Sequence, residues 1–128
     1  MDKRKICVVI TARPSYSRVK SALQAINTHP ELELQIVVAA SALLPRYGSI
    51  INYLKDDGFN NLNLVYNVLE GENLTSMAKT TGLGILEMST VFDNNKPDIV
   101  VTIADRFETM ATAISASYMN IPLAHIQG

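Results

Sequence analysis

Residues 96–126, KPDIVVTIADRFETMATAISASYMNIPLAHI, contain two apolar runs separated by a segment rich in alanine and serine. The runs, at 96–104 and 121–126, predict strands, the second of them buried, because continuous apolar residues are typical of parallel sheets covered by helices. The segment between them, 105–119, predicts a helix whose small residues allow it to lie close to a sheet. A strand, a helix and a strand in this order predict a parallel βαβ unit.

The rest of the chain continues this alternation. Three further strands and three further helices are expected, the strands at 5–11, 32–40 and 61–68 and the helices at about 15–28, 50–57 and 74–94. The order β-α-β-α-β-α-β-α-β predicts one α/β domain over residues 1–128 with a doubly wound, Rossmann-like parallel sheet.

Two of the helices carry local signals. Ser15 or Ser17 is expected to cap the first helix, because serine side chains accept hydrogen bonds from the first free N–H groups of a helix. Gly82 and Gly84 interrupt the pattern of the third helix and indicate close packing or a kink. The TGLG string that contains these glycines follows no predicted strand and lacks a third glycine, so it does not predict a dinucleotide-binding loop.

Composition excludes several classes of function. The chain has 128 residues, a formal net charge of −1 and scattered Lys and Arg residues, so we expect neither a nucleic acid nor an anionic membrane surface as partner. No apolar run approaches the roughly 18 residues of a membrane span. Cys7, the single cysteine, lies in an apolar run and is expected to be a buried thiol. The N-terminal segment lacks a signal-peptide cleavage site, and the expected location is cytoplasmic.

Ligands of doubly wound sheets bind beyond the carboxyl ends of the strands. Six polar residues of this chain follow predicted strands and are the candidate site residues: Arg13, Ser17, Asp105, Arg106, His125 and Gln127. Each has an ordinary structural alternative. Arg13 suits a phosphate at a helix N-terminus but also suits a surface loop. Asp105 suits an acid or base and equally a helix cap, and His125 suits a catalyst or a core residue. No His and Cys spacing predicts a metal site.

The motifs KICVVITARPSYSRVKSAL, SALLPRYGSIINYLKDDGF and KPDIVVTIADRFETMATAISASYMNIPLAHIQG together resemble the hydrolysing UDP-N-acetylglucosamine 2-epimerases. Within that family the resemblance is to the branch that makes precursors of sialic and related nonulosonic acids. It implies two Rossmann-like domains in a GT-B-like arrangement, of which residues 1–128 are most of the N-terminal one. The uridine-binding domain would follow. The resemblance also implies a reaction that requires no nicotinamide and no redox metal, so no cofactor is expected.

The resemblance also implies a reaction and residue roles. Family members convert UDP-N-acetylglucosamine, or a related UDP-2-acetamido sugar, to N-acetylmannosamine or its analogue plus UDP, through a 2-acetamidoglucal. Asp105 matches a candidate acid or base, and His125 matches the histidine of the fifth-strand motif. Arg13, Ser17 and Arg106 match substrate-binding positions. Gln127 stands where several members have Glu, and an amide does not transfer protons as a carboxylate does.

These observations lead to three hypotheses. The first is the N-terminal part of a hydrolysing epimerase, inactive on its own, with a UDP-amino sugar as substrate. The alternatives are a stand-alone nucleotide- or phosphate-binding module without catalysis and a non-catalytic interaction protein. Because apolar surface would be exposed without the partner domain, a homo-oligomer is also expected.

Overall fold

The computed structural model describes residues 2–43, 50–68, 73–104 and 107–127. Five parallel strands form one sheet in the order β3-β2-β1-β4-β5. Their bounds are β1 Arg4–Ile10, β2 Leu32–Ala39, β3 Leu62–Val65, β4 Ile99–Ile103 and β5 Leu123–Ile126. The chain moves outward from β1 through β2 to β3 and then crosses to the other side of β1, where β4 and β5 lie. The predicted doubly wound, Rossmann-like sheet is confirmed.

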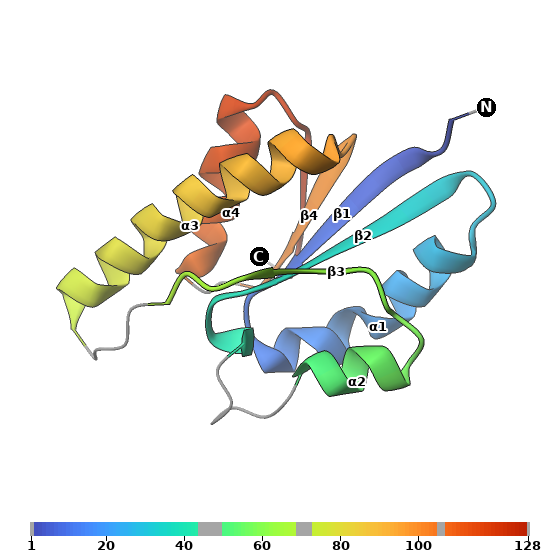
Figure 1. Ribbon diagram of the computed structural model, residues 1–128, viewed down its shortest axis with the longest axis horizontal. Helices are drawn as coiled ribbons and strands as arrows, with labels where there is room; N and C mark the ends of the chain where they lie inside the picture. The colour runs from blue at the N-terminus through green and yellow to red at the C-terminus, as the bar shows by residue number, and fades with distance from the viewer. Residues whose placement is uncertain (1, 44–49, 69–72, 105–106, 128) are drawn as a thin grey trace.

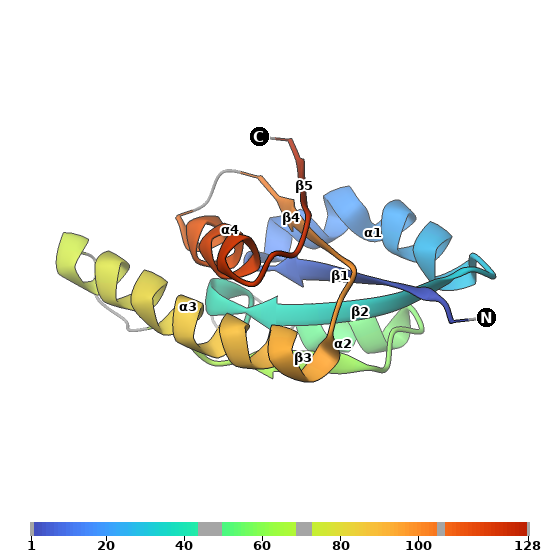
Figure 2. The same ribbon diagram turned by 90° about the horizontal axis from the view of Figure 1, so that it is seen from above.

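Helices cover both faces of this sheet (Figure 1). They are α1 Arg13–Thr28, the short 3₁₀ helix η1 Ala40–Leu43, α2 Ile50–Asp56, α3 Leu74–Asn95 and α4 Glu108–Tyr118. The pair α1 and α2 packs on one face, and the pair α3 and α4 packs on the other, as the view from above also shows (Figure 2). Among the described residues, no helix is both long enough and apolar enough to span a membrane.

Successive side chains of the central strands point to opposite faces of the sheet and pack in two separate cores. Val8 of β1 packs in the core under α1 and α2, together with Leu23 of α1. Val9 of β1 packs in the core under α3 and α4, together with Phe92 of α3. Cys7 lies fully buried in this second core, as expected, and burial raises the pKa of its thiol to about 12. The thiol is therefore neutral near pH 7 and contributes packing rather than reactivity.

Two local predictions are wrong. The first helix begins at Arg13, and its N-cap residue, Ala12, makes no side-chain capping bond. Ser15 is buried, and the Ser17 hydroxyl instead donates to the Pro14 carbonyl at 3.0 Å. Proline is favoured in the first turn of a helix because its nitrogen has no proton to satisfy, and Pro14 thus permits an earlier start.

The second wrong prediction concerns β5, which its apolar sequence predicted to be a buried strand. All four of its residues are exposed. The strand is the edge of the sheet and pairs with β4 alone among the described strands. Residues at an edge gain cover only from elements beyond them, so an apolar sequence does not ensure burial.

The two glycines of α3 differ in what surrounds them. A Cβ on Gly84 would lie 2.8 Å from the Ala111 Cβ of α4 and 3.0 Å from Asn67 Nδ2, whereas a Cβ on Gly82 would meet nothing within 4 Å. The close packing that the sequence indicated is therefore found at Gly84, where the absence of a side chain lets α3 and α4 approach each other.

Gly84→Ala is expected to lower the free energy of unfolding by about 1–3 kcal/mol, because an added methyl group in a filled contact forces the helices apart. The matched variant Gly82→Ala is expected to raise it by about 0.5–1 kcal/mol, because alanine restricts the unfolded chain and favours a helix. Urea unfolding followed by circular dichroism measures both. Equal effects of the two substitutions would contradict the close approach of the two helices.

Candidate functional site

The carboxyl edge of the sheet concentrates unusual backbone conformations. The residues directly after β2, β4 and β5 are Ala40, Ala104 and Gln127, and their φ angles are 55°, 63° and 58°. A residue other than glycine adopts this left-handed region at a cost of about 1 kcal/mol. At Ala40 the side chain of Asn67, buried after β3, compensates by accepting the Ala40 N–H at 2.9 Å. Backbone strain of this kind is typical of functional sites.

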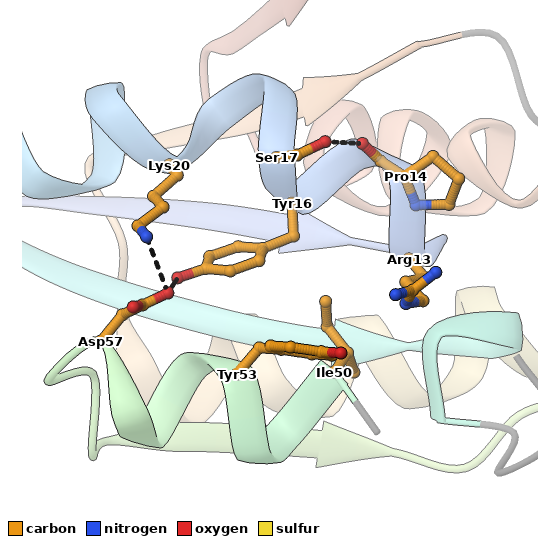
Figure 3. A pocket seen from close by; sticks show the side chains of 8 residues that line it. All are labelled: Arg13, Pro14, Tyr16, Ser17, Lys20, Ile50, Tyr53 and Asp57. Atoms are coloured by element: carbon orange, nitrogen blue, oxygen red, sulfur yellow. Dashed lines mark hydrogen bonds and ion pairs between the residues drawn. The ribbon is translucent and has the colours of Figure 1, made fainter. Parts of the chain in front are cut away.

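A cleft of about 470 Å³ opens between α1 and α2 beside this edge. Figure 3 shows the eight residues that line it: Arg13, Pro14, Tyr16, Ser17, Lys20, Ile50, Tyr53 and Asp57. The structure therefore brings two of the predicted site residues, Arg13 and Ser17, into one cleft.

The Arg13 side chain, at the start of α1, contacts an aromatic ring. Its guanidinium carbon lies 5.6 Å from the centre of the Tyr53 ring of α2, a cation–π distance (Figure 3). At a partly exposed site such a contact is worth about 0.5–1 kcal/mol. The contact restricts the guanidinium while leaving its five N–H donors available to an anion, next to a helix N-terminus that itself favours negative charge.

The other charged groups of the cleft neutralise one another. The Tyr16 hydroxyl donates to Asp57 Oδ2 at 2.5 Å, and Lys20 Nζ lies 3.1 Å from the same oxygen. Both contacts hold the pKa of Asp57 below its usual value, and the hydrogen bond from Tyr16 has the larger effect. Burial raises the pKa of Tyr16, and the bond to Asp57 and its charge raise it further. The cluster links the end of α2 to α1. Arg13 makes none of these contacts, so its positive charge is not paired within the cluster.

The predicted site residues of the fifth strand lie at the other side of the edge. His125 is exposed on β5, and its Nδ1 lies 2.7 Å from Oγ1 of Thr102 on β4. The ends of the two strands are joined by a backbone bond from the Ala104 N–H to the Ile126 carbonyl at 2.9 Å. Gln127 follows in the left-handed conformation and is exposed. His125 is therefore not the buried core residue that its apolar surroundings in the sequence allowed.

Asp105 and Arg106 lie outside the described residues. The nearest described carboxylate in the chain is Glu108, which is 3% exposed in the first turn of α4. A carboxylate there is favoured by the partial positive charge of the helix N-terminus. The N-cap residue of α4 is Phe107, so Glu108 stands at the first helical position. An acidic residue near the predicted start of this helix is a sequence signal that could have singled it out. Within the ranges that the structure describes, no group of three His, Cys, Asp or Glu residues could hold a metal ion.

Comparisons with known proteins converge on one family. The sequence profile of the UDP-N-acetylglucosamine 2-epimerase family matches residues 24–128. A UDP-N,N'-diacetylbacillosamine 2-epimerase (hydrolyzing) from Legionella pneumophila is 33% identical over 98% of this chain and 33% of its own length. A GDP/UDP-N,N'-diacetylbacillosamine 2-epimerase (hydrolyzing) from Campylobacter jejuni is 30% identical over 100% of this chain and 33% of its own.

A solved structure agrees in fold. UDP-GlcNAc 2-epimerase from Neisseria meningitidis, bound to UDP-GlcNAc, superposes with a TM-score of 0.76 at 20% identity, over 95% of this chain and 32% of its own. The chain thus spans about a third of the length of the relatives that it matches.

Proposed function

Because the chain belongs to the UDP-N-acetylglucosamine 2-epimerase family, we propose that it is the N-terminal, Rossmann-like domain of a hydrolysing member. The substrate is UDP-N-acetylglucosamine or a related UDP-2-acetamido sugar, and the products are N-acetylmannosamine or its analogue and UDP. The observation that carries the proposal is the pair of relatives at 33% and 30% identity, both of which are named as hydrolyzing 2-epimerases.

The proposed reaction has two steps. A base removes the proton from C2 of the sugar, the C1–O bond to UDP breaks, and the electron pair forms the C1=C2 double bond of a 2-acetamidoglucal. Water then adds its hydroxyl to C1 while a proton returns to C2 on the opposite face, which inverts that carbon. The protein must supply groups that move protons and groups that stabilise the departing diphosphate.

The candidate residues divide between these tasks. We assign proton transfer to Asp105, and contacts to the diphosphate to Arg13, Ser17 and Arg106. The position of Arg13 at the start of α1 supports this assignment, because the one described carboxylate that lines the cleft, Asp57, pairs with Tyr16 and Lys20 and not with Arg13. His125 contacts the substrate from β5. Gln127 is assigned a binding role, since an amide neither gives nor takes the proton.

The remainder of the proposal concerns assembly. Uridine is held by a second domain, and the 128-residue chain alone is expected to show no turnover. The homo-oligomer and the cytoplasmic location expected from the sequence belong to the same proposal. Analytical ultracentrifugation tests the first of these, and a stable monomer would contradict it.

The test is a fusion protein in which this chain replaces the matching third of the Legionella pneumophila relative. We expect this fusion protein to release UDP from UDP-N-acetylglucosamine or from UDP-N,N'-diacetylbacillosamine, and mass spectrometry of the free sugar identifies the preferred substrate. The unaltered Legionella protein is the positive control, and the 128-residue chain is the negative one.

Each contrary outcome has a distinct meaning. A folded fusion protein that releases no UDP from either sugar would contradict the proposed reaction. Tight binding of UDP by the chain alone, combined with that inactivity, would favour a nucleotide-binding module without catalysis. Robust turnover by the chain alone would contradict the need for a second domain.

A further inference from the structure

Thr102 and His125 are direct partners in the parallel register of β4 and β5. Their side chains therefore project from the same face of the sheet. Thr102 Oγ1 lies 2.7 Å from His125 Nδ1. Thr102 is 2% exposed, whereas His125 is exposed. A buried hydroxyl thus contacts one nitrogen of an accessible imidazole, and the direction of this bond decides which nitrogen carries the proton.

The hydroxyl of Thr102 decides that direction. A hydroxyl has one proton to donate, and a buried O–H without an acceptor costs more than an oxygen with an unused lone pair. Among the described residues, His125 is the only side chain or carbonyl that bonds this hydroxyl. If the ring donated from Nδ1, the hydroxyl proton would have no acceptor. The bond that gives the Thr102 proton an acceptor runs from the Thr102 O–H to an unprotonated Nδ1.

We propose that Thr102 is a positioning residue that holds His125 as the tautomer with its proton on Nε2. The consequence of this tautomer for catalysis rests on the proposed function. In that reaction the ring carries its proton at Nε2, where it suits an acceptor oxygen, and the Nδ1 lone pair that Thr102 engages is not available as a base.

The ring proton can be located directly in the 128-residue chain by nitrogen NMR of the two imidazoles. His29 provides an internal reference, because its Nδ1 accepts the Glu31 N–H at 3.1 Å and it is therefore also protonated at Nε2. We expect His125 to give the same pattern as His29, with an unprotonated Nδ1 and a protonated Nε2. A protonated Nδ1 in neutral His125 would overturn the proposal.

Two variants test whether Thr102 causes this preference. Thr102→Val keeps the shape of the side chain and removes the hydroxyl, and we expect it to shift the His125 tautomer ratio towards Nδ1–H by about fivefold to tenfold, the effect of one hydrogen bond. Thr102→Ser keeps the hydroxyl and should restore the ratio. His29 should be unchanged in both. An unchanged ratio in Thr102→Val would overturn the proposal, and Thr102→Ser keeps the test informative if the valine variant does not fold.

The fusion protein separates this inference from the proposed function. If it is active, Thr102→Val should lower kcat/KM by about fivefold to tenfold and Thr102→Ser should recover most of the loss. An active fusion protein that is indifferent to Thr102→Val would overturn the catalytic consequence. If the fusion protein is inactive but the NMR pattern is as expected, the proposed function fails and the positioning of His125 by Thr102 is supported.

Discussion

Replacement of Asp105 by Asn in the active fusion protein is expected to lower the rate of UDP release by about 10²- to 10⁴-fold, the usual contribution of a positioned acid or base. The amide has nearly the shape of the carboxylate but takes up no proton at neutral pH. Because the proton moves in the transition state, kcat should fall far more than KM changes. Steady-state kinetics of UDP release measure both quantities.

Asparagine is the informative substitution because it separates the two interpretations of Asp105. The N-cap residue of α4 is Phe107, and Asn and Asp are about equally favoured before a helix, so a residue with only a local structural role there would tolerate the change. A variant with near-normal activity would therefore contradict the acid or base role. Asp93→Asn is the matched control: Asp93 is exposed near the end of α3 and pairs with Lys96 at 3.0 Å, so its loss should leave activity unchanged.

The sequence predicts the central strands to within one residue at most ends, for a physical reason. In β1, successive side chains enter different cores, as Val8 and Val9 do, so the whole run must be apolar. The same kind of run misleads at β5, because burial there depends on what lies beyond the edge of the sheet. β3 is also shorter than predicted, four residues within the expected 61–68.

The rule that ligands bind at strand ends selected Arg13 and Ser17, which the structure places in one cleft. It did not select the residues around them. Tyr53 and Asp57 belong to α2, and the bond between Tyr16 and Asp57 joins positions 41 residues apart. No local pattern shows how α2 docks against α1. Thr102 was missed for a similar reason: in the sequence it is one more residue of an apolar strand. Its importance comes from the register that places it beside His125.

Removal of the Arg13 guanidinium is expected to weaken binding of UDP to the fusion protein by about 10²-fold, comparable to the loss of a charge-assisted hydrogen bond to the diphosphate. Arg13→Lys keeps the charge but loses the planar fork, and an intermediate loss of about tenfold is expected. Tyr53→Leu removes only the ring under the guanidinium and should cost about twofold to fivefold, the strength of an exposed cation–π contact. Calorimetric titration with UDP, which the fusion protein does not consume, gives all three values.

The graded order of these losses, Arg13→Ala largest, then Arg13→Lys, then Tyr53→Leu, follows only if Arg13 holds the anion and Tyr53 holds Arg13. Arg18→Ala is the control, because Arg18 lies exposed on the same helix, carries the same charge and is absent from the residues that line the cleft. Long-range attraction by net charge would make Arg13→Ala and Arg18→Ala equivalent and would fade with added salt. Equal losses would therefore contradict a specific contact, whereas a large loss confined to Arg13 identifies the start of α1 as the diphosphate subsite.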